Sequence, residues 1–277
     1  TMDIGIECLL ANDMQTAYAF AQQLNDLNLE RRQVESQIKQ EALAEMQSLH
    51  LDEDNLPAAL VMFDEQWHQG VIGIVAGRLK EQFHRPSIVF AADKDGIHIK
   101  GSARSIEGIH IRDAIEQVAE QHPHLVSFFG GHAAAAGLTI EKKNFEQFKQ
   151  VFTDLISQSD DALFDAVLWT DGVLPEQNIE LKTVDLIEQL GPWGQKFPSP
   201  VFEGEFQLLE HRWLKEVHLK LKLGLSNGQS VDAIAFNARD QFQFDPMKST
   251  VKVVYELDKN EFNGRVNLQL RMLHLEN

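Results

Sequence analysis

The chain is organised around one unusual stretch, Phe129-Gly130-Gly131-His132-Ala133-Ala134-Ala135-Ala136-Gly137. Glycine lets the main chain take a positive φ or approach a ligand closely, and successive alanines leave little bulk above that backbone. If residues 133–136 begin a helix, the free amides of its first turn face Gly130, Gly131 and His132 in the geometry that binds a phosphate. A tight strand-to-helix turn that packs on small residues explains the same composition, so both interpretations stay open.

The composition is that of a soluble globular protein, for which we expect a cytoplasmic location. The chain has 277 residues, enough for two domains, and 43% of them are hydrophobic. No uncharged run is long enough to cross a membrane, and no membrane contact is expected. The single cysteine, Cys8, excludes an internal disulfide. The start, Thr1-Met2-Asp3-Ile4-Gly5-Ile6, lacks signal-peptide features and is typical of the middle of a longer chain.

The net charge of −17, from 25 basic and 42 acidic residues, argues against an extended nucleic-acid surface. Bulk charge does not decide the question, because a phosphate backbone is bound by a local stripe of Lys and Arg that faces one way. The positions of the basic residues therefore matter more than their number.

The N-terminal part is predicted to be helical. Residues 4–10 fit the end of a buried strand or a helix, and Asn12 and Asp13 are good N-cap residues for a helix that begins just after them. From there to about Leu49 the chain has no proline or glycine, and its apolar residues recur at spacings of three and four. We predict one long helix with at most one break. Its segment 27–33 is polar nearly all round, as in a helix that connects two domains.

Residues 58–156 alternate short apolar strands with amphipathic helices, which predicts an α/β domain. The expected strands are 58–63, 86–90 and 97–100. One expected helix begins at residues 67–70, and two others cover 109–118 and 145–156. The third strand runs into Lys100-Gly101-Ser102-Ala103-Arg104-Ser105, predicted to be a loop. Such a loop offers a guanidinium, two hydroxyls and open amides, which suit a phosphate or carboxylate. An ordinary surface turn is the alternative.

Three of these motifs together resemble the DHH-associated domain of the RecJ family of bacterial single-strand-specific exonucleases. They are residues 67–76 (WHQGVIGIVA), 101–105 (GSARS) and 130–137 (GGHAAAAG). Residues 27–31 resemble the inter-domain helix of the family, and residues 191–202 resemble the opening of its oligonucleotide-binding (OB) fold. The resemblance implies an inter-domain linking helix in residues 1–52, a DHH-associated α/β domain in 53–160 and an all-β OB barrel in 161–277.

The resemblance also implies a fragment that binds DNA without cutting it. In this family Mn²⁺ or Mg²⁺ is held by Asp and His motifs of an N-terminal DHH domain, and the Asp-His-His triplet is absent from this sequence. By analogy the intact enzyme is a hydrolase that degrades single-stranded DNA from its 5′ end in repair and recombination, through a metal-activated water. No catalytic residue and no metal are expected in this chain. The implied partners are single-stranded DNA and the N-terminal DHH domain, and the single-strand binding protein is a further hypothesis.

The 5′-phosphate pocket of the family maps onto Ser102 and Arg104, with Gly130, Gly131 and His132 beside them. Arg104 can hold two phosphate oxygens while Ser102 donates its hydroxyl, so a terminal phosphate would be favoured over an internal one.

For three other polar residues, the match to the family is less specific. Arg31 matches a position from which the family reaches the DNA, whereas Arg32 is less certain, and surface charges of no function are the more usual interpretation. His68 matches a family histidine, but a structural histidine at the start of a helix explains it equally well.

Residues 161–277 are predicted to be mostly β. A strand and turn at 167–172 are followed by a helix that ends at Gly191-Pro192. Asn227-Gly228 and Asn263-Gly264 are hairpin signals. The periodicity predicts five strands, and the resemblance implies that they close into a barrel. The expected strands are 202–209, 218–223, 230–236, 250–257 and 266–273.

A local positive track interrupts the acidic sequence between residues 211 and 222. It contains Arg212, Lys215, Lys220 and Lys222. Aromatic rings on which bases can stack are interleaved with it or come after it, at Trp213, His218 and Phe236. Alternatively, Phe236 is a core residue and the lysines merely alternate outward along a strand. An acidic tail of the single-strand binding protein is a further hypothesis for Arg212 or Lys215.

Two other function classes remain open. A small-molecule phosphoesterase of the DHH superfamily uses the same Gly-Gly-His loop for a nucleotide, but it has no need of a terminal barrel. An RNA-binding module is the third class, since alanyl-tRNA synthetases carry a related associated domain. Salt-dependent binding of long oligonucleotides but not of mononucleotides favours the exonuclease fragment over the phosphoesterase, and a preference for tRNA favours the third class.

Overall fold

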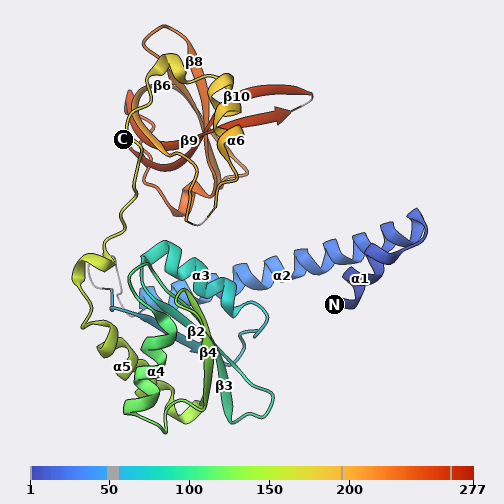
Figure 1. Cartoon of the computed structure of the whole chain (residues 1–277), viewed down its shortest axis with the longest axis vertical. Helices are drawn as coiled ribbons and strands as arrows, with labels where there is room; N and C mark the ends of the chain where they lie inside the picture. Colours follow the sequence, from blue (N-terminus) through green and yellow to red (C-terminus); the bar gives the residue numbers. More distant parts are fainter. Residues whose placement is uncertain (1, 49–55, 195, 263) are drawn as a thin grey trace. The chain divides into compact units, whose positions relative to one another are not determined.

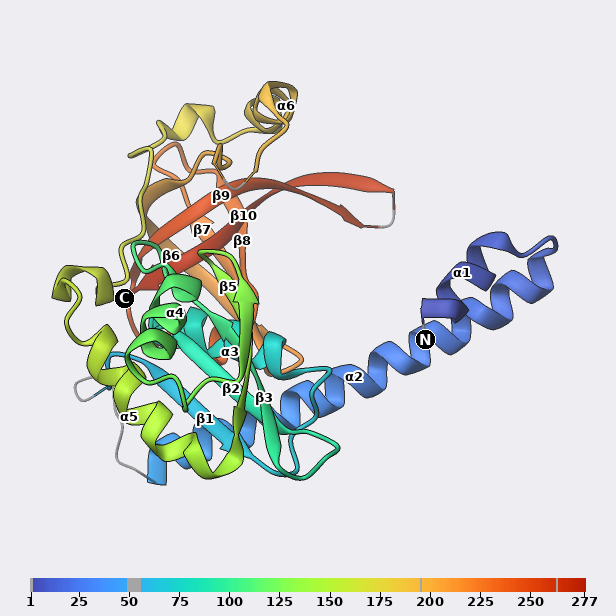
Figure 2. The ribbon, with the colours of Figure 1, turned by 60° about the horizontal axis from the view of Figure 1, so that its bottom comes forward.

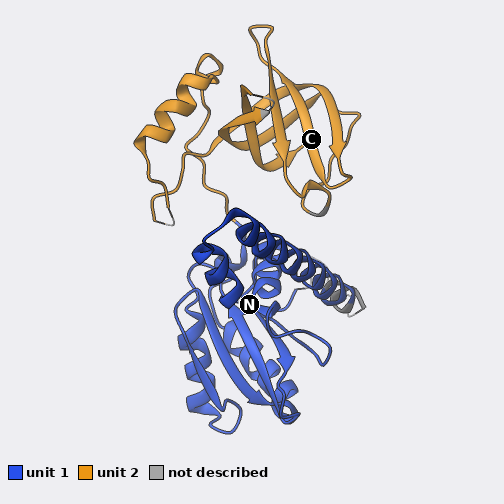
Figure 3. Cartoon of the chain, turned by 90° about the vertical axis from the view of Figure 1, so that its right-hand side faces the viewer, with its two compact units in different colours: residues 1–166 blue, residues 167–277 orange. Residues whose placement is uncertain are grey.

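The computed structural model describes residues 2–48, 56–194, 196–262 and 264–277. The chain divides into two compact units, Thr1–Ala166 and Val167–Asn277 (Figure 3). None of the helices among the described residues is both long enough and apolar enough to cross a bilayer.

The N-terminal segment is helical, as predicted. Helix α1 (Met2–Leu10) has no buried residue, and α2 (Met14–Ser48) runs on without a break (Figure 1). Asp13 caps α2, because its carboxylate accepts a hydrogen bond from the amide of Thr16 at 2.9 Å. Because residues 4–10 lie in α1, the helical alternative for this segment is confirmed and the strand is wrong. Helix α1 lies against the N-terminal part of α2, and the C-terminal part of α2 packs on the α/β domain through the buried side chains of Ile38 and Ala42.

The first unit is built on a mixed sheet with the order β1-β2-β3-β5-β4. Strands β1 and β2 are parallel, and the other neighbours are antiparallel. The bounds are β1 Leu60–Asp64, β2 Ser87–Ala92, β3 His98–Arg104, β4 Phe128–Gly131 and β5 Ala135–Glu141. With its helices, this arrangement confirms the α/β class.

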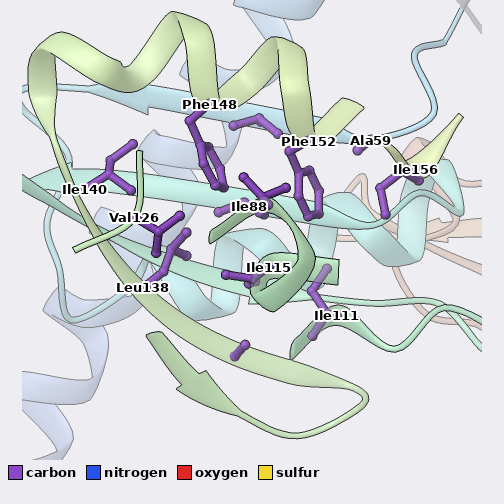
Figure 4. Close-up of a cluster of buried hydrophobic side chains, with 14 of the residues drawn as sticks. Ala59, Ile88, Ile111, Ile115, Val126, Leu138, Ile140, Phe148, Phe152 and Ile156 are labelled. Atoms are coloured by element: carbon purple, nitrogen blue, oxygen red, sulfur yellow. The ribbon is translucent and has the colours of Figure 1, made fainter. Parts of the chain in front are cut away.

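Helices α4 (Ile111–Gln121) and α5 (Phe145–Ile156) cover one face of the sheet along its length. Figure 4 shows the resulting core, in which Phe148 and Phe152 of α5 lie over Ile88. The opposite face is partly covered by α3 (Ile72–Phe83), which lies against β2 and β3, and by the end of α2, whose buried residues cluster with those of β1 and β2. The helical prediction for residues 145–156 is confirmed.

Two local predictions around the glycine-rich motifs are wrong. Residues 133–136 do not begin a helix but form the tip of the β4–β5 hairpin and the start of β5. Ala135 and Ala136 pair with Arg104 and Ala103 of β3, and this pairing outweighs the helix propensity of alanine. The GSAR segment is not a loop either, because residues 101–104 belong to β3.

The second unit is a closed barrel with the strand order β10-β8-β7-β6-β9. The bounds are β6 Phe202–Leu214, β7 His218–Gly224, β8 Ser230–Ala235, β9 Thr250–Phe262 and β10 Arg265–Glu276. The five strands and the barrel are confirmed, although β9 and β10 are longer than predicted and their hairpin projects from the barrel (Figure 2). Residues 167–172 do not form the predicted strand. The predicted turn at Asn263 lies outside the described residues.

Helix α6 (Leu181–Leu190) agrees with the prediction and is tied to β9 by one lysine. Lys259 Nζ lies 2.7 Å from Asp185 and 2.5 Å from Glu188. The hydrogen bonds that Lys259 donates to these two carboxylates raise its pKa to about 12. Lys259 therefore remains protonated at all physiological pH values and holds α6 against the projecting hairpin.

Candidate nucleic-acid interface

The sheet face that carries α3 is only half covered. Its buried hydrophobic cluster takes strand residues from β1 and β2 and none from β3, β4 or β5. Because alternate side chains of a strand point to opposite faces, the residues of these three strands that point away from α4 and α5 lie on the half that this cluster leaves open. The start of α3 reaches this half, against Ser102 and Arg104 of β3. Apart from His98 and Glu141 at the far ends of β3 and β5, we call this set the bare face: Lys100, Ser102, Arg104, Ala135, Gly137, Thr139, Phe128 and Gly130.

Small residues make the bare face accessible down to the backbone. Ser102 lies opposite Gly137, and Gly137 lies opposite Gly130. The side chain in this row across the three strands is therefore the hydroxymethyl group of Ser102, beside two glycines. In the neighbouring row, Arg104 lies opposite Ala135. A ligand can therefore reach the sheet beside Ser102 and Arg104 without displacing a large side chain.

Arg104 and Ser102 are two residues apart on one strand and form a pair on this face. Arg104 Nη1 donates to Ser102 Oγ at 3.2 Å and to the carbonyl oxygen of Ala103 at 2.8 Å. Since Ser102 Oγ accepts that bond, its own proton is available for a ligand. Within the described ranges, no acidic side chain forms an ion pair with Arg104. The pair therefore offers an unneutralised cation and a hydroxyl donor to an anion.

The start of α3 adjoins this pair. At Gly73, a Cβ atom would lie only 2.9 Å from Ser102 Oγ and 3.0 Å from Arg104 Nη2, so only glycine fits without a shift. Gly73 lies in the first turn of α3, where the amides of Ile72 and Gly73 have no acceptor within the helix. A helix N-terminus that favours anions is thus present, but it belongs to α3 and not, as predicted, to residues 133–136.

The β4–β5 hairpin is held beside Arg104 by backbone hydrogen bonds. Ser105 donates to the carbonyl of Ala134 at 3.0 Å, and Ile111 donates to that of Ala133 at 2.9 Å. His132 lies exposed at the tip, and in the described part of the chain its imidazole has no hydrogen-bond partner. The structure therefore brings Gly130, Gly131 and His132 to the end of the sheet where Arg104 lies.

Arg31 and His68 are in different situations. Arg31 bonds to Asn28 and, at 3.0 Å, to Glu35, which also accepts from Arg78 of α3 at 3.5 Å. No bond from Arg31 to Ser102 or Arg104 occurs among the described residues, so its role in DNA binding stays a prediction, as does that of the exposed Arg32. His68 Nδ1 accepts a hydrogen bond from the amide of Gly70 at 3.0 Å, which is the structural role.

Arg212, Lys220 and Lys222 of the predicted positive track line an open groove of about 380 Å³ on the barrel, whereas Lys215 is not among its lining residues. Two of the four cations of the track carry acidic partners: Lys220 lies 2.6 Å from Asp232, and Lys222 lies 3.7 Å from Glu210. Arg212 is exposed on β6, directly opposite Lys220. The track is therefore less positive than its sequence indicates.

The aromatic residues near this groove are accessible. Phe236 is 49% exposed and meets the ring of His218 edge-on at 5.4 Å, so the alternative that Phe236 is a core residue is wrong. Trp213 is 37% exposed, and Lys215 lies just after it in the β6–β7 turn with a φ of 51°. Rings and cations thus lie at one end of the β6–β7 hairpin, as base stacking and phosphate contacts require.

The part of the chain that the structure describes contains no group of three or more His, Cys, Asp or Glu side chains that could hold a metal ion. These residues do not fit the Mn²⁺ or Mg²⁺ that the family resemblance implies for the intact enzyme.

Comparison with known families assigns both units. A DHHA1 domain model matches residues 55–158, and a RecJ OB domain model matches residues 170–274. The class of the chain is therefore a DHHA1 domain followed by an OB barrel. It belongs to the RecJ family and corresponds to the C-terminal region of that family.

Curated relatives agree over nearly the whole chain. The single-stranded-DNA-specific exonuclease RecJ of Dickeya dadantii is 45% identical over 99% of this chain and 48% of the relative. The RecJ of Escherichia coli is 40% identical over 97% of this chain and 47% of the relative. A crystal structure of RecJ from Thermus thermophilus in complex with Mg²⁺ is 26% identical, with a TM-score of 0.76 over 99% of this chain and 40% of that one. The chain thus spans about half the length of these two curated relatives.

Proposed function

We propose that this chain is the DNA-binding part of a 5′-to-3′ single-stranded-DNA exonuclease that acts in repair and recombination. In this proposal Ser102 and Arg104 bind the 5′-phosphate, the barrel carries the strand, and hydrolysis belongs to a DHH domain that holds Mn²⁺ or Mg²⁺. The chain alone then binds DNA in the cytoplasm without cutting it.

The observation that carries the proposal is the unneutralised Arg104 beside the start of α3. A terminal phosphate monoester carries a charge of about −1.5 to −2 at pH 7, whereas an internal phosphodiester carries one negative charge. A site with one guanidinium, one hydroxyl and the first-turn amides of a helix favours the species with more charge and more free oxygens. Anchoring the end in this way gives the reaction its polarity.

The groove on the barrel supports binding of the rest of the strand. Arg212 contributes most of its cationic character, because Lys220 and Lys222 are partly neutralised by their carboxylate partners. Lys215 adds an exposed cation in the β6–β7 turn. The exposed Arg212 and Lys215 also suit the acidic tail of the single-strand binding protein, and docking of that tail remains part of the proposal.

Replacing Arg104 with alanine tests the 5′-phosphate assignment. We expect wild-type chain to bind a 5′-phosphorylated oligonucleotide more tightly than its 5′-hydroxyl counterpart, and Arg104→Ala to abolish that difference. The loss corresponds to about 1.5–2 kcal/mol, the low end for a charged hydrogen-bonded contact that is partly solvated. Fluorescence anisotropy with labelled single-stranded DNA measures both affinities.

Arg112→Ala is the matched control, because Arg112 is a similarly exposed arginine whose guanidinium is already paired with Glu116 of α4. It should leave the preference for a 5′-phosphate unchanged. Equal affinity of the wild-type chain for both ends would refute the pocket. Binding of mononucleotides without long oligonucleotides would favour a small-molecule phosphoesterase, and a preference for tRNA would favour an RNA-binding module.

A glycine pair in α3 tests the geometry of the pocket without removing a polar group. Gly73→Ala places a methyl group against Ser102 Oγ and Arg104 Nη2, so the guanidinium must move and the affinity for a 5′-phosphate should fall several-fold. Gly77→Ala in the same helix meets open space. It should stabilise the unit by up to about 1 kcal/mol without changing the affinity. Urea unfolding and anisotropy on both variants separate the two effects, and equal binding by the two would contradict the assignment of Gly73.

A further inference from the structure

One large apolar side chain lies on the bare face, and the α/β core does not use it. Phe128 is 72% exposed and belongs to β4, the edge strand of the sheet. Its neighbour Phe129 packs against the α4–α5 core, so the alternation of the strand turns Phe128 to the same side as Ser102 and Arg104. The residues between them are small, as the rows across Gly130, Gly137 and Ala135 show.

The simplest structural role for Phe128 does not account for its exposure. An aromatic residue on an edge strand can shield a neighbouring glycine of the next strand. Phe128 lies opposite Thr139 and diagonal to Gly137, yet Gly137 is itself exposed. A ring that covered its neighbour would lose more of its own surface. The exposed ring also adds an aggregation hazard to an edge strand, which proteins usually avoid.

The distance between Phe128 and the anion site is comparable to distances along a short piece of nucleic-acid strand. Gly130 is two strands away from Ser102 in the same row, and Phe128 is two residues further along β4. With strand spacings of about 4.8 Å and a rise of about 3.3 Å per residue, the Cα atoms of Ser102 and Phe128 are about 12 Å apart. The path between them is a flat surface of small residues. Lys100, in the same row as Phe128, adds a cation that is paired with Asp93.

We propose that Phe128 is a stacking platform for an unpaired base near the 5′ end of the bound strand. The proposal rests on the proposed function, because the 5′-phosphate at Ser102 and Arg104 fixes which nucleotides reach the ring. Stacking on an aromatic face is tolerant of sequence, since every base has a π-face. A duplex end offers no unpaired base to the ring, so the platform adds a preference for single strands next to the end that is held.

Oligonucleotides with a 5′-phosphate and the fluorescent base 2-aminopurine at one of the first nucleotides test the platform. Binding to the wild-type chain should quench the fluorescence at one or two of these positions. Phe128→Ala should remove the quenching and weaken binding by about fivefold to a hundredfold, the range measured when a stacking residue is truncated to alanine. Phe128→Tyr should retain both, because the ring remains.

Two controls separate stacking from other effects. Ile97→Ala removes a 60% exposed apolar side chain from the turn before β3 and should change neither readout. An abasic nucleotide at the quenched position should make wild-type chain and Phe128→Ala bind equally. If Phe128→Ala keeps the quenching and the affinity while the 5′-phosphate preference persists, the platform is refuted and the pocket stands. If the wild-type chain shows no 5′-phosphate preference, the pocket itself fails, whatever the result at Phe128.

Discussion

Gly131→Ala should destabilise the first unit by about 2–5 kcal/mol, since strain and overpacking act together at this position. Gly131 has a φ of +150°, a conformation that side chains rarely adopt. An added Cβ would also lie 2.4 Å from the carbonyl oxygen of Ala135 and 2.5 Å from the Cα of Ala136. Both are backbone atoms of the paired strand, so the hairpin cannot relax without losing its register.

Gly130→Ala is the matched control for this prediction. A Cβ at Gly130 meets no atom within 4 Å, and its stability should stay within about 0.5 kcal/mol of the wild type. Urea unfolding followed by far-UV circular dichroism, to which the helices of the first unit contribute most, measures both variants. Similar midpoints for the two variants would show that the hairpin does not depend on the conformation of Gly131.

Sequence patterns predicted those elements whose period is set by one buried face. Phe148, Phe152 and Ile156 recur at helical spacing and are all buried against the sheet, so α5 has the predicted bounds. The barrel strands were predicted for the same reason, because Leu219, Leu221 and Leu223 alternate inward along β7. Elements with no such stripe were misjudged. In the alanine run, local propensity favours a helix, and the pairing with β3 and β4, which no local pattern shows, puts Ala135 and Ala136 in a strand.

The candidate site was predictable in part. Ser102 and Arg104 are two residues apart, which puts them on one face of a strand, and this holds even though the segment was predicted to be a loop. The start of α3 beside them could not be predicted, because the close approach of Gly73 depends on how a helix crosses the sheet. The partial neutralisation of the positive track was also hidden, since Asp232 meets Lys220 only through the register of β7 and β8.

Tyr255 should make the stability of the barrel fall at alkaline pH. Its side chain is fully buried between Phe202 and Phe206, and its hydroxyl has no hydrogen-bond partner in the described part of the chain. Burial, with a smaller contribution from the charge of Glu176, raises the pKa of Tyr255 to about 12. The unfolded chain has a tyrosine pKa of about 10. The free energy of unfolding is therefore unaffected by this group below pH 10 and falls as pH rises from 10 towards 12, by up to about 3 kcal/mol in total.

Tyr255→Phe should remove this alkaline loss and cost little at neutral pH, because it deletes a buried hydroxyl without breaking a hydrogen bond. The control is Tyr18→Phe, since the chain has two tyrosines and Tyr18 is 71% exposed on α2. Urea unfolding of each variant between pH 8 and pH 11.5 can be monitored by tryptophan fluorescence, because three of the four tryptophans, Trp169, Trp193 and Trp213, lie in the second unit, and both variants share the signal of Trp67 from the first. Lysine deprotonation also weakens the wild type in this range, so the informative quantity is the difference between variants. If Tyr255→Phe lost stability as steeply as Tyr18→Phe, the buried hydroxyl would titrate normally, which would require water inside the barrel.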